Sequence, residues 1–168
     1  MVVAVLAVTW WEMRKTDDSA ALASGEKVLS AERAAGLHPV LFAALSEWEI
    51  SGPFPVRVGW RGGLRTAAEQ AALYAVGRSL PGSIVTNAET PEASAHGRGA
   101  AVDLYPVDAR GESLPEEAPQ WLALGQWFEA RGFVWGGRWT TLHDAPHVEI
   151  KDWRALPYPP PDYEVANG

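Results

Sequence analysis

The chain is organised around one short stretch, Ser94-Ala-His-Gly-Arg-Gly-Ala-Ala-Val-Asp103. It places an imidazole, His96, seven residues before a carboxylate, Asp103, with mostly glycine and alanine between them. Glycine allows the backbone to turn tightly, and small side chains leave room around the turn. We therefore expect His96 to lie on a loop and Asp103 on the strand that follows, which is a typical arrangement of two metal ligands.

The residues after this loop alternate as they do in a strand. Strand periodicity places Ala101, Asp103 and Tyr105 on one face, and Val102 and Leu104 on the other. An acid between two aliphatic residues is costly to bury unless it has a partner. A cation is such a partner, so the strand predicts a metal-binding carboxylate.

The second half of the motif is near the end of the chain, in Asp144-Ala-Pro-His-Val-Glu-Ile150. A short strand is predicted here, with His147 and Glu149 on one face and Val148 on the other. Together the two motifs predict a set of two histidines and one carboxylate, which suits a single zinc ion with a fourth position open to water or substrate. Its members are His96, Asp103 and His147.

These motifs resemble those of a known family. Ser-x-His-x-x-Gly-x-Ala-x-Asp over 94–103, Trp-Gly-Gly-x-Trp over 135–139 and Asp-x-x-His over 144–147 are similar to the zinc D-alanyl-D-alanine carboxypeptidases and L-alanyl-D-glutamate endopeptidases. Those enzymes cut the stem peptides of peptidoglycan. The resemblance covers about residues 37–151 and implies a Hedgehog/DD-peptidase-like fold. Two positions depart from the family pattern, Leu64 and Arg98.

The resemblance also implies roles for residues outside the metal set. Arg65 would bind a carbonyl or carboxylate of the substrate, and Gln70 would help to order the site. Asp144 would be the catalytic acid and base. Glu149 competes for that role because it faces the same way as His147, but we assign it to orienting a metal ligand. From the residues alone, a surface salt bridge is the simpler interpretation of Arg65.

Three further residues are candidates for contact with substrate or for support of the site. Ser94 is expected to hydrogen-bond either the metal loop or a ligand, and nothing indicates that it is a nucleophile. Trp135 and Trp139 flank two glycines, so this segment either lines a substrate groove or simply forms a turn.

Helix and strand signals place these motifs in an α+β domain. Helices are predicted from Pro39 to about Glu49, after a capping box at Thr66 and Glu69, and from Pro119 to a cap at Gly132. Strands are predicted at 56–60, 100–106, 133–137 and 147–150. We expect a small antiparallel sheet that carries the ligands on one face, with helices packed on the other face.

Composition limits the possible partners. The 168 residues carry a net charge of −7 and no basic patch, so nucleic acid is not an expected partner. There is no cysteine, which excludes disulfides and thiolate zinc sites. The chain predicts a peptidase domain over 37–156, a preceding apolar segment and linker or helix over 1–36, and a proline-rich tail over 157–168. The apolar start, too short to span a bilayer, is either the remnant of an anchor that begins upstream or an element packed on the domain.

Three functions are consistent with this sequence. The first is an L-alanyl-D-glutamate endopeptidase, such as an endolysin, and the second is a D,D-carboxypeptidase that removes a terminal D-alanine. The third is a zinc-bound recognition module without catalysis, which the resemblance to the Hedgehog fold allows. The first is favoured, because Asp-x-x-His preceded by Trp-Gly-Gly-x-Trp resembles the endopeptidases, whereas the carboxypeptidases more often carry glutamate where this chain has Asp144. We expect a monomer that acts on peptidoglycan in the cell envelope, outside the cell or during phage lysis.

Overall fold

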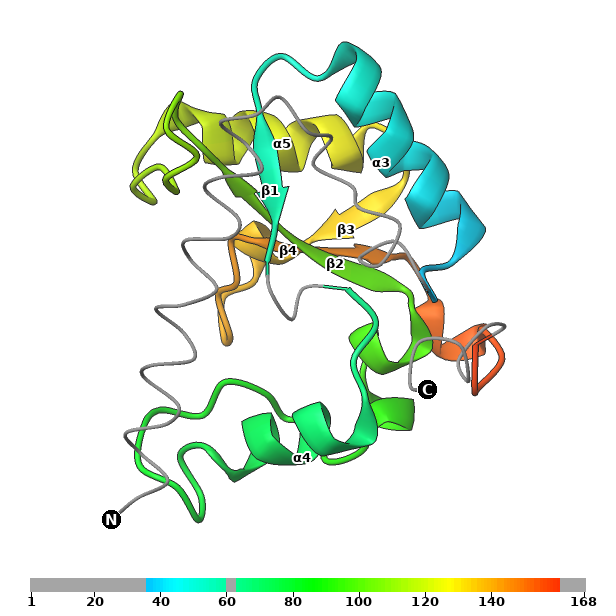
Figure 1. Cartoon of the computed structure of the whole chain (residues 1–168). Coiled ribbons are helices and arrows are strands. Elements are labelled where there is room, and N and C mark those ends of the chain that lie inside the picture. Colours follow the sequence, from blue (N-terminus) through cyan, green and yellow to red (C-terminus); the bar gives the residue numbers. More distant parts are fainter. Residues whose placement is uncertain (1–35, 60–62, 161–168) are drawn as a thin grey trace.

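The computed structural model describes residues 36–59 and 63–160. The predicted N-terminal apolar segment, except for residue 36, and residues 161–168 of the predicted tail lie outside this range. These described residues form three α-helices and a small sheet, which can be followed in Figure 1. Their bounds are α3 Pro39–Ser51, α4 Ala67–Ala75 and α5 Pro119–Glu129, with strands β1 Val56–Val58, β2 Ala101–Pro106, β3 Phe133–Trp135 and β4 His147–Ile150. Within the described ranges, no helix has both the length and the apolar character needed to cross a bilayer.

The four strands form one antiparallel sheet in the order β1-β2-β4-β3. In the register between the two central strands, Asp103 lies directly opposite His147. Two residues that are far apart in the chain are thus brought together by the pairing of β2 with β4. The strand predicted at 56–60 pairs with β2 over Val56–Val58, and the N–H of Gly59 still donates to the carbonyl of Asp103, while residue 60 lies outside the described residues.

The main hydrophobic core lies between one face of the sheet and helices α3 and α5, as expected for an α+β fold. Val102, Leu104 and Val148 point into it and are fully buried. Helix α5 also contributes to this core, because its Leu124 and Phe128 are fully buried. Each large apolar side chain buried in this way contributes roughly 1.5–3 kcal/mol to folding. The core therefore fixes which face of β2 and β4 is left for polar side chains.

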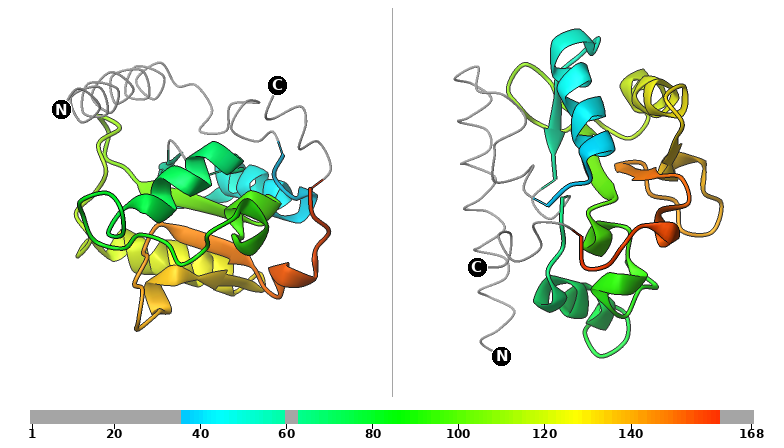
Figure 2. Two further views of the ribbon diagram at one scale, coloured as in Figure 1. Left: turned by 90° about the horizontal axis from the view of Figure 1, so that it is seen from below. Right: turned by 90° about the vertical axis from the view of Figure 1, so that its right-hand side faces the viewer.

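Helix α4 is separate from this core. In Figures 1 and 2 it lies at the opposite end of the molecule from α3 and α5. It begins with the predicted capping box, in which Thr66 and Glu69 satisfy each other's backbone N–H groups. Its one buried residue is the polar Gln70, so its inner face is turned toward polar neighbours rather than toward the core.

Candidate metal centre

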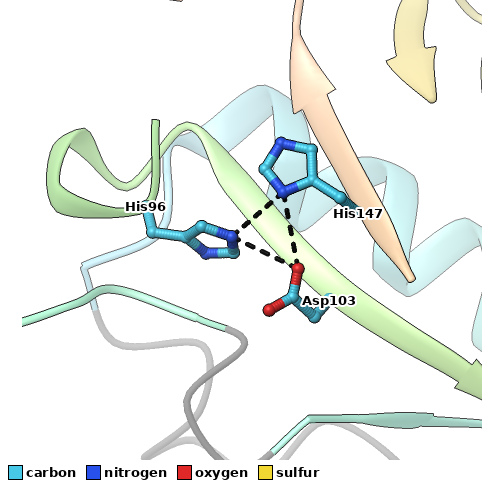
Figure 3. A group of neighbouring side chains, drawn as sticks. All are labelled: His96, Asp103 and His147. Carbon is cyan, nitrogen blue, oxygen red and sulfur yellow. Dashed lines mark hydrogen bonds and ion pairs between the residues drawn. The ribbon is translucent and has the colours of Figure 1, made fainter. Parts of the chain in front are cut away.

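Three side chains converge above the polar face of the sheet (Figure 3). His96 comes from the short 3₁₀ helix η2 (His96–Arg98), Asp103 from β2 and His147 from β4. His96 Nε2 lies 3.2 Å from Asp103 Oδ1 and 3.1 Å from His147 Nδ1. His147 Nδ1 lies 3.5 Å from the same carboxylate oxygen. One potential ligand atom from each residue therefore faces a common point, as the sequence motifs predict.

The outer nitrogen of each imidazole is held by an acceptor. His96 Nδ1 lies 3.1 Å from the carbonyl oxygen of Gly63, and His147 Nε2 lies 3.0 Å from Glu149 Oε2. When these outer nitrogens carry the protons, both inner nitrogens present lone pairs to the common point. Fixing the tautomer of a metal-binding histidine in this way is a usual feature of metal sites. The arrangement fits a cation held by two imidazoles and one carboxylate.

The electrostatics of the group also favour positive charge at this point. Burial opposes the ionised form of Asp103, but the neighbouring His96 and His147 outweigh it and hold its pKa well below the ordinary range. Burial likewise opposes a charge on His147, yet its hydrogen bonds to Asp103 and Glu149 raise its pKa to about 9. For His96, burial prevails and lowers the pKa.

The shape of the metal loop depends on its two glycines. A Cβ on Gly97 would lie 2.1 Å from the carbonyl oxygen of Pro91. Gly99 has a positive φ of +64°, and a Cβ there would lie 2.0 Å from the oxygen of Gly36. A side chain is therefore excluded at both positions by sterics, and at Gly99 also by the backbone conformation. The sequence expectation that small residues allow a tight turn here is confirmed.

Arg65 and Gln70 lie next to each other in the interior. The Arg65 side chain is largely buried, and its Nη1 donates a 3.0 Å hydrogen bond to Gln70 Oε1. Gln70 in turn donates from Nε2 to the carbonyl of Ala88. The backbone N–H of Arg65 donates to the carbonyl of His96 at 3.2 Å. The structure thus places Arg65 beside His96, with its side chain largely buried. The simpler interpretation from the residues alone had placed Arg65 in a salt bridge on the surface.

Asp144 lies on the loop before β4, partly buried. Its carbonyl accepts from the backbone N–H of His147 at 3.1 Å, and its own N–H donates to Gly136 at 3.2 Å. Burial raises the pKa of its carboxyl, the charge of Asp103 raises it further, and His147 and Arg65 act in the opposite direction. The charges of Asp103 and His147, two members of the candidate metal site, therefore act on the Asp144 carboxyl.

The two tryptophans predicted near the site have different surroundings. The Trp139 ring lies 4.9 Å from that of His147, at a tilt of 44°. Trp135 is buried in the main core, and its Nε1 donates a 2.7 Å hydrogen bond to the carbonyl of Ala145. A Cβ on Gly137 would lie 2.1 Å from the Trp135 ring, so the glycine pair allows the chain to pass closely over this indole. Trp135 supports the loop from beneath.

The structure also places Ser94, the remaining candidate, and His143, the neighbour of Asp144 in the sequence. Ser94 is buried in the metal loop, where its carbonyl accepts from the N–H of Arg98 at 3.2 Å. His143 is exposed and lies 2.8 Å from Glu116. Sequence reasoning missed the carbonyls of Gly63 and Ala88, because a backbone acceptor leaves no signal in the residue type.

Comparisons with known proteins show similarity to peptidases that act on peptidoglycan. Residues 88–150 match the family described as D-alanyl-D-alanine carboxypeptidase. The peptidoglycan L-alanyl-D-glutamate endopeptidase CwlK of Bacillus subtilis (strain 168) is 33% identical over 102 residues, which cover 52% of this chain and 57% of CwlK. The L-Ala D-Glu endopeptidase ChiX of Serratia marcescens is 27% identical in sequence, with a TM-score of 0.50, over 75% of this chain and 90% of the ChiX chain.

Proposed function

Because the chain belongs to the family of peptidoglycan metallopeptidases that includes D-alanyl-D-alanine carboxypeptidases and L-alanyl-D-glutamate endopeptidases, we propose that it is a zinc enzyme of the second kind. Its substrate would be the stem peptide of peptidoglycan, and the bond cut would join L-alanine to D-glutamate. The relatives named as L-alanyl-D-glutamate endopeptidases support this choice of bond.

The observation that carries the proposal is the convergence of His96 Nε2, His147 Nδ1 and a carboxylate oxygen of Asp103, within 4.8 Å of one another. Two nitrogens and one oxygen are the ligand types of catalytic zinc sites, which keep a fourth position open. The acceptors at Gly63 and Glu149 support the same assignment, because they leave both inner nitrogens free to bind the ion. When bound, zinc polarises a peptide carbonyl and makes a nearby water molecule more acidic.

Asp144 is the proposed acid and base. Its carboxylate takes a proton from the attacking water and returns it to the nitrogen of the leaving amine, which completes hydrolysis of the peptide bond. A raised pKa suits this cycle, because the group must both accept and donate a proton near neutral pH. Glu149 is already engaged with His147 Nε2, which favours its role as a positioning residue.

Arg65 is the proposed contact for a substrate carbonyl or carboxylate, since its charge already acts on Asp144 and His96. Gln70 would orient it through the hydrogen bond to Nη1. Trp139, which lies against His147, is the proposed aromatic wall for the peptide, with Trp135 beneath it as support. Ser94 would order the metal loop from inside. A peptidoglycan substrate implies that the protein acts in the cell envelope or outside the cell.

Mass spectrometry of muropeptides tests the proposal. Purified peptidoglycan is digested with the zinc-loaded protein, with Asp144→Asn, and with wild type in the presence of a chelator. We expect fragments that end in L-alanine on the glycan side and begin with D-glutamate on the other, and we expect both controls to abolish them. Restoring zinc to the chelated wild type should restore cleavage.

Other outcomes identify other functions. Loss of a single terminal D-alanine would assign the chain to the carboxypeptidases, as the description of the matched family suggests. Stoichiometric zinc binding without any cleavage would contradict an enzyme and favour a recognition module. Cleavage that Asp144→Asn leaves unchanged would remove Asp144 from the proposed mechanism.

A further inference from the structure

The three proposed ligands differ in how firmly the fold holds them. Asp103 and His147 are paired opposite each other in the centre of the sheet, so the backbone ladder sets their separation. His96 instead belongs to η2, in a loop between 3₁₀ helix η1 (Pro91–Ala93) and β2. The relative position of the third ligand therefore depends on whatever holds this loop.

On its inner side, the loop is held by two segments. The backbone carbonyl of His96 accepts from Arg65, and the carbonyl of Gly99 accepts a 2.7 Å hydrogen bond from the N–H of His38. The carbonyl oxygen of Gly63 lies 3.1 Å from Nδ1, the outer ring nitrogen of His96. These contacts orient the imidazole but leave the other side of the loop to be held by residues that follow β4.

On that other side, Arg98 joins three segments of the chain. Its Nε donates a 2.8 Å hydrogen bond to the carbonyl of Glu92, and its Nη1 donates to the carbonyl of Leu156. Its Nη2 also lies 3.7 Å from the carboxylate of Glu92. The guanidinium is 5.5 Å from the ring centre of Tyr158, and the side chain is only 12% exposed. Arg98 thus ties the metal loop to the segment after β4.

A small apolar cluster lies between the same two segments. Ala95 and Ala100 of the loop pack with Trp153 of the 3₁₀ helix η4 (Trp153–Ala155), and Leu156 lies against them. The segment after β4 is therefore packed against the loop through side chains as well as through the guanidinium. Figure 2 shows this segment, in red, running beside the green loop.

We propose that Arg98 is a positioning residue for the metal ligand His96, and that it acts by fastening the segment at Trp153–Tyr158 to the metal loop. The proposal rests on the metal site described above and extends it to a residue two positions beyond the ligand. A planar guanidinium can donate to two carbonyls that lie in different directions, whereas a lysine ammonium is a single point of charge. Arginine at this position is thereby explained, although it departs from the family pattern.

Zinc affinity provides the test. Dissociation constants are measured by competition with a chromophoric chelator for wild type, Arg98→Met and Arg98→Lys. Arg131→Met is the matched control. Arg131 also stacks on an aromatic ring, Trp127, and pairs with a glutamate, Glu47, but it lies just after α5 and not in the loop that carries His96. The visible absorption spectrum of the cobalt-substituted proteins reports ligand geometry, which a loss of general stability would not alter.

We expect Arg98→Met to weaken zinc binding about tenfold, the lower end of the range for residues that orient ligands, because the inner contacts remain. Its cobalt spectrum should change, Arg98→Lys should lie between it and wild type, and Arg131→Met should match wild type in both measurements. Wild-type affinity and an unchanged spectrum in Arg98→Met, or in Arg98→Lys should the first variant not fold, would overturn the proposal. Failure of the wild type itself to bind zinc would instead overturn the metal site.

Discussion

Replacing Glu149 with glutamine tests how much the acceptor behind His147 contributes to metal binding. Glu149 Oε2 lies 3.0 Å from His147 Nε2, and the glutamate side chain is only 15% exposed. The substitution keeps the size of the side chain and one acceptor oxygen but removes the charge. Glu149→Gln therefore tests the effect of the carboxylate charge on metal binding while the size of the side chain is kept.

The expected magnitude follows from the strength of this hydrogen bond. A hydrogen bond to a charged partner contributes about 1.5–3 kcal/mol, and a neutral one about 0.5–1.5 kcal/mol. The difference is roughly 1.4 kcal/mol, which corresponds to about a tenfold weaker zinc complex. Glu149→Ala also leaves the ring N–H without this acceptor in a buried position, so we expect about 100-fold weaker binding.

Competition with a chromophoric chelator at fixed neutral pH measures both variants against wild type. Glu47→Gln is the control, because it removes an equal charge from an exposed pair with Arg131. Its zinc affinity should equal that of wild type. Binding by Glu149→Gln within twofold of wild type would refute the reasoning, because the carboxylate charge would then contribute nothing through His147.

Three further predictions concern pH, the loop that carries Asp144, and the core. In protein freed of metal, the pKa of His147 is raised from 6.5 to about 9 by folding, so its contribution to stability is complete below pH 6.5 and is lost as the pH rises through about 9. Chemical denaturation should show a fall of up to about 3 kcal/mol over this range, and a His147→Gln variant with the same fall would contradict it. Gly136→Ala should lower the rate of muropeptide cleavage, because its Cβ would lie 2.5 Å from the carbonyl oxygen of Asp144; a wild-type rate would show that the loop adapts. Phe128→Ala should reduce the free energy of unfolding by about 3–5 kcal/mol in a urea titration, since the ring is fully buried, and a loss below about 1 kcal/mol would contradict this packing.

Much of the fold could be predicted from local patterns. The capping box at Thr66 and Glu69 forms as expected, and Pro39 begins α3, which runs two residues beyond the predicted end. The alternation around Asp103 correctly separates its polar face from its core face, because side-chain direction in a strand depends only on the count of residues. The edge strand predicted at 133–137 is shorter, because β3 ends at Trp135 and the 3₁₀ helix η3 (Gly136–Arg138) begins there.

The sequence by itself determined the residue types of the proposed ligands, their spacing and the faces on which they lie, because these follow from residue identity and from the period of a strand or helix. Only the tertiary structure decided that His96 uses Nε2 and His147 uses Nδ1 toward the common point. Rotation of a ring is set by the acceptor behind it, and that acceptor is either a backbone carbonyl or a neighbouring carboxylate. The contact between Arg98 and Leu156 likewise joins segments 58 positions apart. Such contacts depend on how the whole chain packs, which no local pattern encodes.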